Sequence, residues 1–130
     1  MSYLSAFTTQ VVNFFEELTQ TIPEEKDVKM ALEAVKGAKK INPRLIYNLF
    51  YEHMYVPLKD IIERRDVAAI VAYGKIKANT QYNEIMPAIT LFDKHWTTLS
   101  HSTQEAIWQY LKVLCVLCEK ITAQTASSTA

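Results

Sequence analysis

The segment 102–121 constrains the fold of this chain more than any other feature of its sequence. Apolar side chains recur there at steps of four, three, four and three residues, at Ile107, Leu111, Leu114, Cys118 and Ile121. This spacing places them on one face of an α-helix, and Tyr110, Cys115 and Leu117 widen that face. Because so wide an apolar face cannot stay in water, the segment predicts a helix covered by other helices or by a partner.

Six further segments carry helical periodicity or helix-start signals. They predict helices at about 5–20, 23–40, 43–55, 58–64, 67–73 and 84–96, with a polar loop at 75–83 and no strand. We therefore expect an all-α fold, in which residues 1–122 form a single compact bundle of about five to seven helices. The small polar residues at 123–130 predict a flexible C-terminal tail.

Two capping boxes are expected to begin helices. Thr21 and Glu24 have the spacing of such a box before the second helix, and Ser102 and Glu105 have it before the last. In each pair the hydroxyl would accept from a free backbone amide while the carboxylate reaches back.

Proline, asparagine, aspartate and glycine supply the other boundary signals. Asn42 before Pro43 predicts a cap and a first helical residue, and Asp66 predicts another cap. Pro57 is expected to break or kink the helix that begins at Pro43. Gly74 is expected to terminate the helix that Asp66 begins.

The composition excludes several classes of function. Fourteen basic residues balance fourteen acidic ones, whereas a protein that coats nucleic acid normally carries a basic excess. Gly37 and Gly74 are the chain's two glycines, and they stand apart, so Walker and Rossmann phosphate loops are excluded. No apolar run is long enough to span a membrane and no secretory signal is visible, which predicts a protein that is not secreted.

No catalytic, cofactor-binding or metal-binding residue is predicted. Cys115 and Cys118 have the CxxC pattern but lie in the second half of a helix among apolar residues, which favours core cysteines in a reducing compartment. His53, His95 and His101 show neither metal-ligand spacing nor a recognisable catalytic set.

A basic group near one helix junction is a candidate binding surface. Its members, with two tyrosines one helical turn apart nearby, are Lys36, Lys39, Lys40, Arg44, Tyr47 and Tyr51. Contact with nucleic acid or with an acidic protein is one interpretation of this group. The other is a helix C-terminus decorated with lysines, which the helix dipole favours by itself.

Trp108 is the candidate interface anchor. It lies beside the central line of apolar residues in the last helix. A tryptophan side chain buries a large area on binding while only two side-chain torsion angles become fixed. The partner would be another protein or a second copy of the chain.

Three short motifs resemble a known group of proteins. They are Thr21-Ile22-Pro23-Glu24, Trp96-Thr97-Thr98-Leu99-Ser100 and the segment 107–114, which reads IWQYLKVL. Their order is similar to that of a family of small helical proteins encoded by large nucleocytoplasmic DNA viruses of algae and amoebae, with Ile22 where that family usually has phenylalanine. The resemblance implies a viral origin and an all-helical fold, and it implies no settled activity.

These observations predict a non-enzymatic viral protein–protein interaction module, either a virion-associated assembly component or a host-interaction factor. Its partners would be viral or host proteins, or a second copy of the chain, and it would act in the virion or in the host-cell cytoplasm at the virus factory, without a membrane. The alternative is a nucleic-acid-binding accessory protein that uses Lys36, Lys39, Lys40 and Arg44. An enzyme ranks third, and a groove for a partner helix, as in Bcl-2-like bundles, has no sequence motif here.

Overall fold

The computed structural model describes residues 2–78 and 91–129, and all regular structure in these ranges is helical. The α-helices are α1 (Tyr3–Thr21), α2 (Lys26–Ile41), α3 (Pro43–Phe50), α4 (Val56–Glu63), α5 (Val67–Ala78) and α7 (His101–Thr129). Short turns of other helix types join them: the π-helical η1 (Tyr51–Tyr55) and η2 (Leu91–His95), and the 3₁₀-helical η3 (Trp96–Thr98). The predicted all-α bundle is confirmed.

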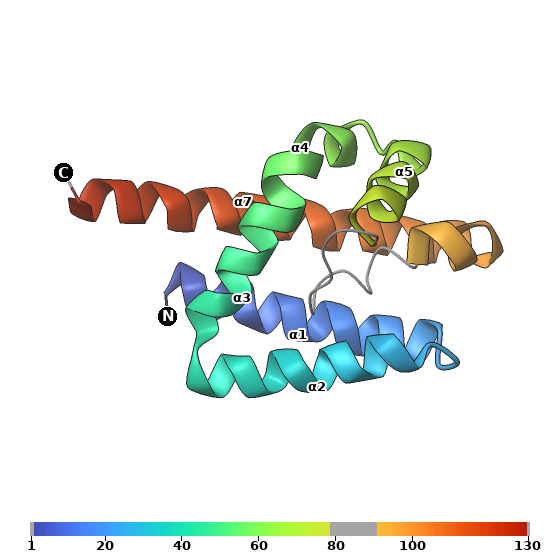
Figure 1. Ribbon diagram of the computed structural model, residues 1–130, viewed down its shortest axis with the longest axis horizontal. Helices are drawn as coiled ribbons and strands as arrows, with labels where there is room; N and C mark the ends of the chain where they lie inside the picture. The colour runs from blue at the N-terminus through green and yellow to red at the C-terminus, as the bar shows by residue number, and fades with distance from the viewer. Residues whose placement is uncertain (1, 79–90, 130) are drawn as a thin grey trace.

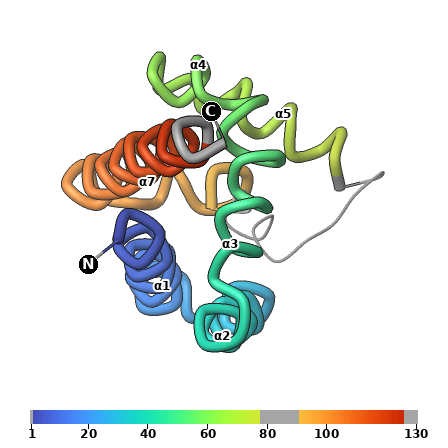
Figure 2. Tube along the Cα trace, turned by 90° about the vertical axis from the view of Figure 1, so that its left-hand side faces the viewer, coloured from blue at the N-terminus to red at the C-terminus, as the bar shows by residue number. Residues whose placement is uncertain are grey.

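Three long helices run along the molecule and one crosses them. α1 and α2 form an antiparallel pair, and α7 runs beside α1 in the opposite direction (Figure 1). The continuous rod of α3, η1 and α4 crosses this set steeply, which is clear in the view along the long helices (Figure 2). None of the helices in the described ranges combines the length and the apolar character needed to cross a membrane.

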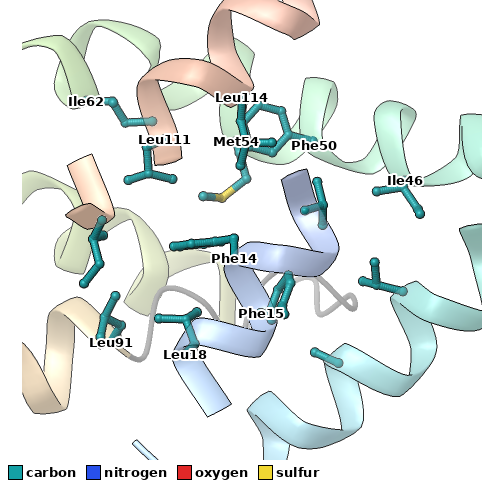
Figure 3. Packing of buried hydrophobic residues seen from close by; sticks show 14 of the residues in the cluster. Phe14, Phe15, Leu18, Ile46, Phe50, Met54, Ile62, Leu91, Leu111 and Leu114 are labelled. Carbon is teal, nitrogen blue, oxygen red and sulfur yellow. The ribbon is translucent and has the colours of Figure 1, made fainter. Parts of the chain in front are cut away.

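The core lies where the crossing rod meets α1 and α7. Phe14 and Phe15 of α1, Phe50 and Met54 of the rod and Leu114 of α7 converge there, each no more than 3% exposed (Figure 3). Edge-to-face aromatic contacts extend the cluster, with the rings of Phe7 and Phe50 5.3 Å apart. The apolar face predicted for the last helix is thus covered by other helices, as expected.

Pro57 does not break the helix that begins at Pro43, since α3, η1 and α4 follow one another without a gap. The expected break is therefore wrong, and the alternative, a kink, stays a prediction. The chain stays helical because η1 widens the backbone by one residue, and Val56 N–H donates to the carbonyl of Tyr51, five residues back. Pro57 then occupies the first turn of α4, where its missing N–H leaves few bonds unmade. The π turn therefore replaces the predicted boundary between two helices.

Neither capping box forms. Thr21 ends α1 and its hydroxyl donates to the Glu17 carbonyl at 2.8 Å, while α2 begins only at Lys26. Ile22 is 2% exposed, and its burial draws the chain into a turn where the predicted helix would have started. At α7 the cap is Ser100, whose Oγ accepts from the Thr103 N–H at 3.2 Å.

The other boundary predictions have mixed outcomes. Asp66 caps α5 as expected, its Oδ1 accepting from the Ala69 N–H at 3.1 Å. Asn42 stands at the N-cap position of α3, but its side chain makes no capping bond. Gly74 does not end α5: it is buried within the helix, which runs on to Ala78.

Two predicted segments are only partly covered by the structure. The polar loop expected at 75–83 begins as helix, and residues 79–90, with the start of the helix expected at 84–96, lie outside the described residues. α7 continues to Thr129, so the helix end expected near Thr122 is several residues too early. The flexibility of residues 123–130 stays a prediction.

Replacing Leu114 with alanine should lower the free energy of unfolding by about 2–5 kcal/mol, because Leu114 is 1% exposed and its loss leaves a cavity. Val113→Ala, one position earlier on the same helix and 40% exposed, is the matched control and should change the free energy by less than about 1 kcal/mol. Urea unfolding followed by circular dichroism measures both. Equal losses would contradict the packing described here.

Candidate partner-binding groove between α4 and α7

An open groove of about 320 Å³ lies between α4, the turn that follows it, and α7. Its apolar members are Ile62, Trp108, Cys115 and Val116. Its charged members are Lys59, Glu63, Arg65, Lys112 and Glu119. Such a mixture of apolar surface and charged rim is typical of a site that accepts an amphipathic group.

The turn after α4 fixes one wall of the groove through an unusual backbone. Arg65 has a φ of 54°, in the left-handed region that glycine normally occupies at a helix end. The N–H of Arg65 donates to the Ile62 carbonyl, and that of Asp66 to the Ile61 carbonyl, at 3.0 and 3.1 Å. These two bonds form a Schellman motif, and a non-glycine residue within it costs about 1–2 kcal/mol.

The left-handed turn aims the Arg65 side chain across to α7. Its guanidinium donates to Glu105 Oε1 at 2.6 Å and lies 5.9 Å from the centre of the Trp108 ring. The strained residue is thus the one that joins α4 to α7 at this end of the groove.

A second polar contact joins the two helices at the other end. Glu119 Oε2 accepts from the Tyr55 hydroxyl at 2.6 Å and from Lys59 Nζ at 3.1 Å. The hydrogen bonds from Tyr55 and Lys59 hold the pKa of Glu119 below its ordinary value, and the bond to Glu119 raises the pKa of Lys59. Burial, followed by the contact with Glu119, raises the pKa of Tyr55.

Two charged residues of the groove remain available to a partner. Within the described chain, the side chains of Lys112 on α7 and Glu63 on α4 make neither a hydrogen bond nor an ion pair. A partner can therefore meet one cation and one carboxylate on opposite walls.

Trp108 is part of the core as well as of the groove. It is 6% exposed and its ring lies 5.2 Å from Trp96 and 5.5 Å from Phe92. Trp108 therefore forms a wall of the groove and does not project from the surface. A role in holding a partner stays a prediction.

The predicted tyrosines are also largely internal. Tyr47 is 7% exposed and its hydroxyl shares a 2.6 Å hydrogen bond with the Thr122 hydroxyl. Tyr51 is half-buried and stacks on Tyr55, with ring centres 5.6 Å apart. This pair lies along η1 and positions Tyr55 for its bond to Glu119.

Most of the predicted basic group already has contacts within the chain. Lys36 Nζ lies 3.8 Å from Glu16 and 4.0 Å from Glu33. Lys39 donates to the Thr9 hydroxyl at 3.1 Å. Arg44 lies over the Tyr47 ring at 5.6 Å, and Lys40 is exposed without a hydrogen bond or ion pair in the described chain. The structure brings these residues to one corner, away from the groove.

His95 and the two cysteines have structural surroundings, whereas His101 is exposed and the ring of His53 lies 3.9 Å from the neighbouring Glu52. His95 Nε2 lies 2.8 Å from Glu25 Oε1, a contact that joins η2 to the turn between α1 and α2. Cys118 is fully buried, and burial raises the pKa of Cys115 and of Cys118 to about 12. No cluster of three or more metal-ligating side chains occurs among residues 2–78 and 91–129.

Sequence reasoning missed the groove because its walls come from distant segments. Arg65 and Glu105 are forty residues apart, and Tyr55 and Glu119 are sixty-four apart. The one sequence signal for the groove was Arg65. It lies in the short connection between two predicted helices, where glycine would be the more usual residue.

No known protein family, no curated protein and no solved structure matches the chain. The resemblance to the viral proteins stays a prediction.

Cys115 and Cys118 should resist alkylation in the folded protein. A thiol pKa of about 12, against an ordinary value of 9.0, lowers the thiolate fraction at pH 8 by about a thousandfold. Mass spectrometry after iodoacetamide treatment should find both residues unmodified in the native protein and modified in urea. Rapid alkylation of native Cys115 would contradict the environment described for the groove.

Proposed function

We propose that this chain is a protein–protein interaction module whose partner inserts an apolar side chain into the groove between α4 and α7. The observation that carries this proposal is the groove itself, which has an apolar lining and a charged rim. Hot spots of protein interfaces are commonly pockets of this kind, filled by one anchor residue and surrounded by polar contacts that exclude water.

The dimensions of the groove favour a side chain of a protein over a large cofactor. Its volume of about 320 Å³ lies at the lower end of the range of small-molecule sites, which is roughly 300–1,000 Å³. The helices on both sides offer further surface, so a partner segment can extend beyond the groove. Lys112 and Glu63 would then set its orientation through opposite charges.

The backbone at Arg65 supports a binding role. A left-handed non-glycine residue persists where the surrounding structure enforces it, and such residues cluster at functional sites. Glycine at this position would relieve the strain but would remove the guanidinium from the groove. Arginine at this strained position is consistent with a side chain that contributes to binding.

Cys115 favours binding over catalysis. It is the thiol in the lining of the groove, and its raised pKa keeps it protonated at neutral pH, whereas a nucleophilic cysteine requires a lowered pKa.

The nucleic-acid alternative receives less support. Lys36 lies near the carboxylates of Glu16 and Glu33, so its charge is partly offset before any phosphate arrives, and Lys39 is held by the Thr9 hydroxyl. Binding through Lys39, Lys40 and Arg44 would supply about three phosphate contacts and a shallow salt dependence.

The viral role is the finer part of the proposal and rests on the resemblance of the sequence motifs. With a viral origin, the partner would be a virion component or a host protein met during infection. Quantitative mass spectrometry of purified particles distinguishes the two: a stoichiometric amount in particles indicates assembly, and absence from particles indicates action inside the cell.

Val116→Asp should abolish partner capture, because it places a carboxylate in the apolar lining of the groove. Val113→Asp is a closely matched control: Val113 lies on the same helix with 40% exposure, against 41% for Val116, but outside the groove lining. Affinity enrichment from cells that naturally produce the protein identifies the partner. Calorimetry with the purified partner then compares the affinities of the parent chain, Val116→Asp and Val113→Asp. Equal binding by both variants would place the interface elsewhere.

Arg65→Gly should weaken partner binding by about tenfold while leaving stability nearly unchanged. Glycine removes a backbone cost of about 1–2 kcal/mol, which offsets the loss of the contacts with Glu105 and Trp108. Arg64→Ala changes the net charge equally but lies outside the groove lining, so its affinity should match that of the parent. Unchanged affinity in Arg65→Gly would argue against a role for this side chain.

A further inference from the structure

The outer face of α2 is an exposed surface that the groove does not use. In both views of the fold α2 lies at an edge of the molecule (Figures 1 and 2). Its buried residues, Val28, Ala31, Leu32 and Val35, face α1 and α3. The outer face carries Met30 at 68% exposure and Ile41 at 87%, the two most exposed large apolar side chains of the described chain.

The spacing on this outer face is that of a coiled-coil seam. Met30, Ala34, Gly37 and Ile41 follow at steps of four, three and four, and all four are exposed. Such alternation of four and three keeps residues in line along one side of a helix, which is the arrangement through which two helices pack side by side. The seam is uncharged along its whole length, with a large apolar side chain at each end and small residues between them.

Charge is distributed unevenly along the helix that carries the seam. Within α2, residues 26–33 contain two carboxylates and two lysines, which gives this half a net charge of 0. Residues 36–41 contain Lys36, Lys39 and Lys40 and no carboxylate, which gives this half a net charge of +3. A parallel copy would place the two basic halves together, whereas an antiparallel copy places the basic half of each helix against the half of the other that carries Asp27 and Glu33.

We propose that a second copy of this chain docks on this face, with the two α2 helices antiparallel about a twofold axis near the middle of the helix. Each Met30 then lies against Ile41 of the other copy, and each Ala34 lies across from Gly37. Glu33 and Lys40 of opposite copies pair along the same side, twice by symmetry. The interface is isologous, so a single surface supplies both halves.

Ala34 and Gly37 allow close approach at the centre of this interface. A Cβ added at Gly37 would meet no atom within 4 Å, so the fold of the single chain leaves this position open. Without a side chain at Gly37, the methyl group of the opposing Ala34 can pack directly on the helix backbone. The short distance between the axes then lets Met30 and Ile41 meet at both ends of the seam.

The charged residues needed for the pairing are available. Lys40 makes no hydrogen bond or ion pair in the described chain. Glu33 lies 4.0 Å from Lys36, with its side chain 76% exposed, so a strong internal contact does not compete. Of the four basic residues considered for nucleic-acid contact, Lys40 thereby gains a carboxylate partner on a second copy.

The size of the surface predicts a weak dimer. A helix of sixteen residues is about 24 Å long, and one such pair buries less than the roughly 800 Å² per partner of a standard interface. Because exposed charges contribute much of the pairing, association should weaken as salt rises. This dimer is independent of the groove, which lies on other helices.

Charge reversal tests the proposal through sedimentation equilibrium of the full chain at low salt. The parent should dimerise at high micromolar concentration, and Glu33→Lys or Lys40→Glu alone should weaken association at least tenfold by placing like charges together. An equimolar mixture of the two variants should form a heterodimer, because lysines at both positions of one copy then meet glutamates on the other. Thermal unfolding of each variant checks that folding is intact.

Each result of this experiment has a definite meaning. A heterodimer in the mixture, with both single variants weakened, supports the antiparallel pairing, since a folding defect cannot be repaired by mixing. A parent that stays monomeric at millimolar concentration overturns the proposal. A dimer whose affinity is unchanged in both charge-reversal variants also overturns it. So does a mixture of the two variants in which no heterodimer forms.

Discussion

The apolar face of α7 is the constraint on which the rest of the structure depends. Leu111, Leu114, Cys118 and Ile121 are each no more than 2% exposed, and burying them requires helices on two sides of α7. α1 covers one side, and the rod of η1 and α4 covers the other. The groove occurs where the second cover is incomplete, because α4 ends at Glu63 and a turn carries the chain away.

The chain has no net charge, but its charged side chains form specific contacts between distant segments. Between the apolar contacts, polar bridges join segments far apart in sequence: Arg65 to Glu105, Tyr55 to Glu119 and His95 to Glu25. The exposed bridges contribute little to stability individually. Their effect is to fix the direction of side chains at the rims of surfaces, so that the groove presents a defined pattern of charge.

The helices and the core could be predicted from the sequence, because the spacing of apolar residues in a helix shows which of its faces is buried. The exact ends of the helices and the groove could not be predicted in this way. Thr21 and Ser102 have the sequence pattern of caps, but the burial of Ile22 and the position of Ser100 decided the outcome through tertiary contacts. Trp108 illustrates the same limit. Its place beside the apolar residues of the last helix was visible in the sequence, but the packing of the Trp96 and Phe92 rings against it was not.

The π turn at Tyr51–Tyr55 acts as a one-residue insertion in an otherwise regular helix. Each residue of an α-helix turns the chain by about 100°, so the extra residue sets the phase of α4 relative to α3. Leu58 and Ile62 face the core only because of that phase. Relatives of this chain that differ by a single-residue gap here would present a different side of α4 to α7, which makes the length of this segment a sequence marker for whether the groove is retained.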